Sequence, residues 1–157
     1  MQKINIDQRV IAAQALFKSG YNCAQSVFLA YSDLFELDQH LAATISGSFG
    51  GGMGRLREVC GTVSAMALIA GFLRPATDPK NQAERSANYA LVQACAEQFR
   101  AINGAIVCRE LLGLTQRTDP PVPALRTDEY YRKRPCVEYV ADAARIIGEK
   151  INAEAEG

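Results

Sequence analysis

The sequence predicts an all-α protein, a single-domain helical bundle packed around a central apolar helix. Three observations lead to this prediction. Apolar residues recur at three- and four-residue intervals over most of the 157 residues, no segment has a convincing strand pattern, and one stretch is apolar on every side. A chain of this length typically forms one domain, so we expect a single helical domain over residues 1–157.

The first part of the chain predicts three helices, because apolar residues follow the helical repeat between recognisable end signals. Ser19-Gly20 is a typical end signal for the first helix. Asn22, with Gln25 three residues later, is a capping pair that opens the second, and Asp38 opens the third. These three helices are predicted over residues 6–18, 23–35 and 38–46.

The central helix is predicted over residues 59–73, where nearly every residue is apolar or small. A helix that is apolar all round is usually the buried centre of a bundle. Its small residues, such as Ala65 and Ala70, would let neighbouring helices approach closely. At about 15 residues it is shorter than the roughly 20 that cross a bilayer, so we expect no membrane span.

A long helix, a short helix, a loop and a last helix follow. Asp78-Pro79 opens the long helix and Asn103-Gly104 ends it, and Gly113 stops the short one. The proline-rich stretch at residues 118–123 can be neither helix nor central strand. The predicted segments are therefore a short helix over 105–112, an extended loop over 113–134, a last helix from Pro135 to about Ile151, and a frayed polar tail.

Composition and charge exclude several classes of protein. The 17 Lys and Arg residues balance 17 Asp and Glu residues, whereas nucleic-acid binders and proteins of anionic membranes are typically basic. Balanced charge is compatible with a homodimer. The first residues lack the apolar segment of a signal peptide, so we expect a cytoplasmic protein. In that reducing compartment, cysteine clusters are more often metal-binding or redox-active than disulfide-bonded.

The five cysteines are the candidate functional residues. Cys23 and Cys136 lie where helices are predicted to begin, Cys60 lies near the start of the central helix, and Cys108 lies in the short helix. The N-terminal end of a helix carries partial positive charge and free N–H groups, which stabilise a thiolate. Thiolate is the form of cysteine that binds metals and attacks disulfides. Cys95 lies in the middle of an amphipathic helix, where a packing role is expected.

Facing helices of a bundle can direct side chains to one point, so we expect Cys23, Cys60, Cys108 and Cys136 to converge at one end of the bundle. The chain has no C-x-x-C pair, which excludes zinc-ribbon, thioredoxin-type and c-type haem patterns. Four thiolates suit tetrahedral iron or zinc and the common iron–sulfur clusters. Free cysteine is also a common core residue, and on that interpretation the chain is an interaction domain without a site.

The glycine-rich segment at residues 50–54 is not a nucleotide-binding loop, since no Lys-Ser/Thr follows it and no strand precedes it. It is either a tight turn before the central helix or a backbone that approaches the cysteines and donates N–H groups to sulfur. Arg55 and Arg57 either offset the charge of a tetrathiolate site or face solvent. Gly51, Gly52 and Arg55 are therefore the candidate cofactor-binding residues.

Five short blocks of the chain, at residues 22–27, 48–54, 58–64, 108–113 and 136–140, together resemble one prokaryotic family of redox-active proteins. The family is named C_GCAxxG_C_C after its cysteine pattern. This sequence has Val59, Gly61 and Ser64 where the pattern has Gly, Ala and Gly. The resemblance implies that the family's four cysteines are Cys23, Cys60, Cys108 and Cys136.

The first hypothesis is a cytoplasmic electron-transfer or redox-sensing protein that binds an iron–sulfur cluster through these four cysteines and works with a redox protein partner. The second is a metal-free protein whose cysteines, with lowered pKa values, cycle between dithiol and disulfide. The third is a structural zinc site with the same four ligands. The basic run Arg132-Lys133-Arg134 is either a docking patch for an acidic partner or a solvated loop.

Overall fold

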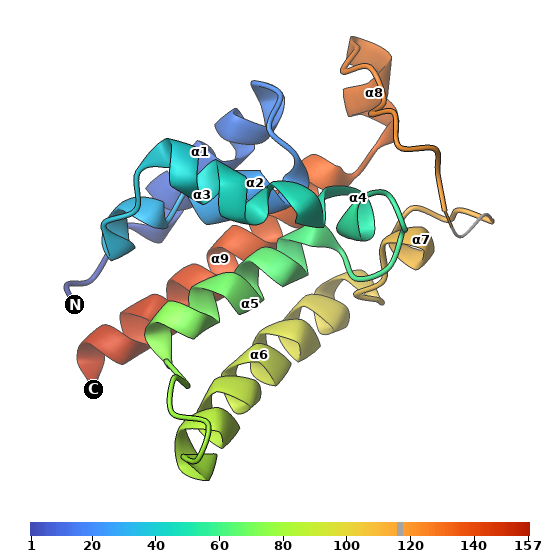
Figure 1. Ribbon diagram of the computed structural model, residues 1–157. Coiled ribbons are helices and arrows are strands. Elements are labelled where there is room, and N and C mark those ends of the chain that lie inside the picture. The colour runs from blue at the N-terminus through green and yellow to red at the C-terminus, as the bar shows by residue number, and fades with distance from the viewer. Residues whose placement is uncertain (116–117) are drawn as a thin grey trace.

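The computed structural model describes residues 1–115 and 118–157, which form an all-α bundle (Figure 1). Helix α5 (Gly61–Leu73) contacts α2 (Cys23–Leu29), α6 (Gln82–Asn103) and α9 (Cys136–Glu156). The predicted central apolar helix is therefore confirmed. Its fully buried side chains include Thr62, Ala65, Met66, Ile69 and Ala70.

The N-terminal half of the bundle follows the predicted pattern with one difference. Helix α1 (Ile6–Lys18) packs along α9, and α3 (Gln39–Ser46) begins where the Asp38 side chain accepts the N–H of Leu41. The predicted second helix is shorter than expected, because α2 ends at Leu29 and a separate 3₁₀ turn, η1 (Ser32–Phe35), follows. Between them Tyr31 turns into the core, where its hydroxyl donates to the Ala144 carbonyl at 2.6 Å.

The glycine-rich segment contains two short turns, η2 (Gly47–Phe49) and α4 (Gly50–Met53). The four residues of α4 amount to about one turn of helix. Inside α4 the backbone of Gly51 and of Gly52 is left-handed, with φ of 69° at each, so the segment is a tight turn and not a continuing helix.

Two later helices differ from their predicted bounds. Helix α6 begins a few residues later than expected, because Asn81 caps it by accepting the N–H of Glu84. It ends as predicted, at the left-handed Gly104. Helix α7 (Cys108–Leu111) is only one turn long, because the residues before it are extended and pair with the segment that leads into α5.

The predicted loop over 113–134 contains a short helix, α8 (Asp128–Lys133), which corrects the expectation of a wholly extended segment. Residues 116–117 of that loop lie outside the described residues. Helix α9 continues to Glu156, so the frayed tail was also a wrong expectation. The Asn152 side chain bonds the backbone N–H and carbonyl of Ile4, which fastens the end of α9 to the start of the chain.

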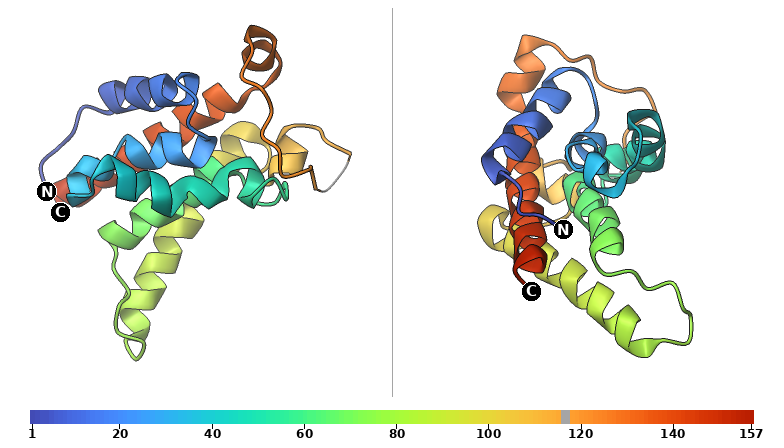
Figure 2. Two further views of the ribbon diagram at one scale, coloured as in Figure 1. Left: turned by 45° about the horizontal axis from the view of Figure 1, so that its top comes forward. Right: turned by 90° about the vertical axis from the view of Figure 1, so that its left-hand side faces the viewer.

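The two chain termini lie together at one end of the bundle, and α4, α7 and α8 lie toward the other (Figures 1 and 2). The connection between α5 and α6 projects away from the rest of the molecule in both views of Figure 2. Among the described residues, none of the helices combines the length and the apolar character that crossing a bilayer would require.

Candidate functional site

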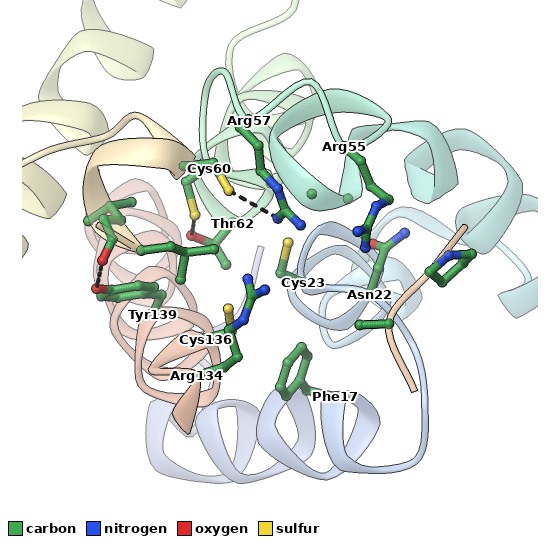
Figure 3. A pocket seen from close by; sticks show the side chains of 18 of the residues that line it. Phe17, Asn22, Cys23, Arg55, Arg57, Cys60, Thr62, Arg134, Cys136 and Tyr139 are labelled. Atoms are coloured by element: carbon green, nitrogen blue, oxygen red, sulfur yellow. Dashed lines mark hydrogen bonds between the residues drawn. The ribbon is translucent and has the colours of Figure 1, made fainter. Parts of the chain in front are cut away.

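Four of the five cysteines line one cavity of about 400 Å³ (Figure 3). Cys23, Cys108 and Cys136 are the first residues of α2, α7 and α9, and Cys60 immediately precedes α5. The structure thus brings the four predicted cysteines to one cavity, each at the N-terminal end of a helix. Cys95 is buried in the core on α6, outside the residues that line the cavity.

An antiparallel backbone contact joins the segments that carry Cys60 and Cys108. The N–H of Cys60 donates to the Ile106 carbonyl at 2.8 Å, and the N–H of Cys108 donates to the Glu58 carbonyl at 2.6 Å. Val59 and Val107 form an isolated β-bridge between these two bonds. This pairing joins the start of α7 to the start of α5, so the N-termini of both helices lie at the cavity.

Three glycines let the backbone approach the cysteines closely. The backbone of Gly51 lowers the pKa of the Cys23 thiol. A Cβ at Gly52 would lie 2.7 Å from the Cys108 Cβ, and a Cβ at Gly61 would lie 2.6 Å from the Cys23 Sγ. Gly51 therefore lines the cavity, as expected of a backbone next to the cysteines, whereas Gly52 packs behind Cys108 and is absent from the described lining.

Two arginines from the turn after α4 also line the cavity. Arg57 is 4% exposed, and its Nε and Nη2 lie 2.7 and 2.6 Å from Asp119 Oδ2, while its Nη1 donates to Cys108 Sγ at 3.6 Å. Arg55 donates from Nε to the Pro120 carbonyl at 2.8 Å. Both arginines have left-handed backbones, with φ of 67° for Arg55 and 60° for Arg57, which is uncommon for residues other than glycine.

These bonds fasten a proline-rich segment across the cavity. Pro121, Pro123 and Ala124 line the cavity next to the residues that Arg55 and Arg57 bind. The candidate Arg55 thus lies at the cavity, and its side chain reaches the covering segment. Arg126, Tyr139 and Thr62 were not among the predicted site residues, and Arg134 belongs to the basic run expected to be either a docking patch or a solvated loop, yet all four line the cavity.

Burial dominates the acidity of the cavity thiols. Desolvation, with a further contribution from neighbouring cysteines, raises the pKa of Cys60 and of Cys136 to about 12, and it also raises the pKa of Cys23. The Gly51 N–H lowers the pKa of Cys23, and Arg134 and Arg126 lower that of Cys136, but by less than burial raises them. The lowered thiol pKa values expected from helix N-termini are therefore wrong for these cysteines, because the thiols are taken out of water.

We expect the reduced, metal-free protein to lose stability as the pH rises above the ordinary thiol value of 9.0. Between that pH and about 12 the unfolded chain releases thiol protons that native Cys60 and Cys136 still hold, so the free energy of unfolding falls. Below that range the native and the unfolded chain both keep the thiol protons, so the contribution of these thiols to the free energy of unfolding is fully present. Urea unfolding at about pH 8 and about pH 10.5 measures the loss, which should be smaller in Cys60→Ala. An equal loss in the variant would contradict the prediction.

The donor set of the cavity suits a metal centre in number and kind, since four sulfur ligands are the usual set for iron–sulfur clusters. Over residues 1–115 and 118–157, no group of three Cys, His, Asp or Glu side chains is spaced to hold a single metal ion. The four thiolates of a cluster are divided among more than one iron atom, so all four do not have to meet at a single ion. The four cysteines fit such a group in chemistry and in their common cavity.

The described chain is an all-α bundle, and four cysteines at helix N-termini line one of its cavities. The fold and the site therefore define a class of helical proteins that carry a cysteine site. The chain belongs to the family described as "Putative redox-active protein (C_GCAxxG_C_C)", which it matches over residues 21–150. This match confirms the resemblance of the five sequence blocks and identifies a redox-active family. No curated protein and no solved structure matches the chain.

Proposed function

We propose that Cys23, Cys60, Cys108 and Cys136 bind an iron–sulfur cluster, and that this cytoplasmic protein transfers electrons to or from a redox protein partner or senses redox state. The observation that supports this proposal most directly is the shared cavity, since four cysteines from four helices line it. Once bound, the cluster would supply one-electron chemistry.

The residues around the cysteines suit an anionic cluster with four thiolate ligands. The guanidinium of Arg57 donates to the Cys108 sulfur, and the backbone of Gly51 lowers the pKa of the Cys23 thiol. Hydrogen bonds to ligand sulfur and nearby positive charge both favour the reduced, more negative state, and they therefore raise the reduction potential. Cys60 and Cys108 are buried, which keeps water away from these two sulfurs, whereas Cys23 and Cys136 are half-buried.

The raised thiol pKa values favour a metal-bound site over metal-free disulfide chemistry. Exchange with disulfides needs a thiolate, and Cys60 and Cys136, each with a pKa raised to about 12, hold their protons at neutral pH. A bound metal compensates for the cost of removing those protons, because thiolate binding and deprotonation are linked. A zinc ion would compensate for the same cost of deprotonation, so the experiment must distinguish a zinc site from an iron–sulfur cluster.

Anaerobic purification followed by iron, zinc and acid-labile sulfide analysis tests the proposal, together with the visible absorption spectrum. We expect a coloured protein with iron and sulfide, and we expect Cys23→Ser and Cys136→Ser each to lose both. Cys95→Ser is the matched control, because Cys95 is buried outside the cavity, and it should keep the cluster.

A colourless, iron-free protein under anaerobic conditions would overturn the cluster. Stoichiometric zinc in that sample would indicate the structural zinc site, and chelation should then unfold the protein. Reversible loss of two hydrogens on oxidation, detected by mass spectrometry, would indicate dithiol–disulfide cycling. Both of these results contradict the proposal.

A further inference from the structure

The cavity carries more positive charge than its neighbours neutralise. Four arginines line it, and no Asp, Glu or Lys of the described residues is part of the lining. Asp119 pairs with Arg57 and lies 3.7 Å from Arg55. Arg126 and Arg134 form no ion pair with a carboxylate of the described chain. Asp119 offsets one of the two charges on its side of the cavity, whereas both charges of Arg126 and Arg134 remain on theirs.

Arg126 is held in a fixed orientation at the cavity wall. Its Nη1 donates to the Phe17 carbonyl at 3.1 Å and its Nη2 donates to the Tyr21 carbonyl at 3.2 Å. Its Cζ lies 4.3 Å from the ring centroid of Phe17 and 5.0 Å from that of Tyr130. These contacts position the guanidinium before any ligand arrives, which reduces the entropy that binding would cost.

Arg134 has its whole guanidinium available. Its Cζ lies 5.8 Å from the same Tyr130 ring, and Figure 3 shows the guanidinium next to Cys136, pointing toward Cys23. Within residues 1–115 and 118–157 no acceptor bonds its side-chain N–H groups. A guanidinium presents its donors as a planar fork that pairs with two oxygens of a carboxylate, sulfate or phosphate.

We propose that this cavity binds a small oxyanion, held by Arg134 and Arg126 beside the four cysteines. Its volume of about 400 Å³ lies in the range of small-molecule sites. Leu111, Leu112 and Pro121 line the same cavity and would shield the ion pairs from water. The inference rests on the proposed function only in placing the bound anion next to a redox centre, since its binding depends on the arginines.

Isothermal titration of the anaerobically purified protein in low-salt buffer tests the site with three probes: inorganic phosphate, sulfate and succinate. We expect at least one probe to bind, and Arg134→Gln to weaken it by about tenfold or more. Arg134→Lys keeps the positive charge but lacks the planar pair of guanidinium donors, so it should weaken anion binding less than Arg134→Gln does. Arg132→Gln is the matched control, because Arg132 is exposed on α8, outside the lining, and its affinity should stay within about twofold of wild type.

Tighter binding of phosphate and sulfate would identify an inorganic ligand, and tighter binding of succinate a carboxylate; either result supports the site. Failure of all three probes to bind wild type would overturn it, as would equal affinities in wild type and Arg134→Gln. Iron and sulfide are measured on the same samples. A colourless protein that binds the anion through Arg134 would refute the cluster but support the anion site. An iron-loaded protein that binds no anion would support the cluster and refute the anion site.

Discussion

Replacing Asp119 with Asn is expected to destabilise the protein by about 3–5 kcal/mol, the usual cost of leaving a buried charge without its partner. Arg57 is 4% exposed, and two of its nitrogens lie within 2.7 Å of one Asp119 oxygen. The Cys108 thiol, 3.6 Å from Nη1, cannot replace the carboxylate while it is protonated. Urea unfolding of the reduced protein measures the change.

Asp7→Asn is the matched control for this substitution. Asp7 pairs with Arg145 at 2.9 Å, but the two side chains are 78% and 50% exposed. Solvent screens such a pair, so its loss should cost less than about 1 kcal/mol. If Asp119→Asn costs no more than Asp7→Asn, the buried pair does not stabilise the covering segment as described. A larger cost should be accompanied by faster alkylation of the cavity cysteines, because the segment that Asp119 fastens forms part of the wall of their cavity.

The helices could be predicted where local signals determine them. Asp38 caps α3 and Gly104 ends α6, as their residue types indicate, because caps and left-handed turns depend on the residues themselves. Prediction failed where distant contacts decide the backbone. Tyr31 ends α2 by reaching α9, and Val107 is extended because it pairs with Val59. Neither partner is visible from the local sequence.

Helix α8 was not predicted, although the sequence does contain the signals of a helix there. Thr127 caps it by accepting the N–H of Tyr130, acidic Asp128 and Glu129 occupy its first turn, and basic residues occupy its last. The signal lies past the last proline of the loop, Pro123, which restricts only its own backbone and that of its neighbour and leaves residues 127–133 free to form a helix.

At the site, the cysteines were predictable and their surroundings were not. All four lie at helix N-termini, and Asn22 and Pro135 mark two of these in the sequence; Cys108 was expected inside a helix over 105–112, but α7 begins at Cys108 itself. Arg126 and Arg134 reach the cavity through contacts with residues distant from the local sequence pattern, Arg126 with Phe17 and both with Tyr130, and these contacts depend on the path of the whole loop. The direction of the thiol pKa shifts was missed for the same reason, since burial is a property of the folded chain.

Gly61→Ala and Gly71→Ala are expected to change stability in opposite directions, although they make the same substitution in the same helix. At Gly61 the new Cβ would lie 2.6 Å from the Cys23 sulfur and 2.8 Å from the Phe49 carbonyl oxygen, so atoms of the cavity must move. Overpacking of this kind costs about 1–3 kcal/mol. At Gly71 no atom lies within 4 Å, and alanine there should add about 0.5–1 kcal/mol through its higher helix propensity.

Thermal and urea unfolding of the two variants measure both signs, and iron analysis of the same samples adds a second readout. Gly61→Ala should also lower the iron content, because it displaces the sulfur of a proposed ligand, whereas Gly71→Ala should leave it unchanged. A gain in stability at both positions would mean that the helix tolerates a side chain against Cys23. The close approach of α5 to α2 would then not fix the position of that cysteine, and the cavity would be less preorganised than the packing of Gly61 indicates.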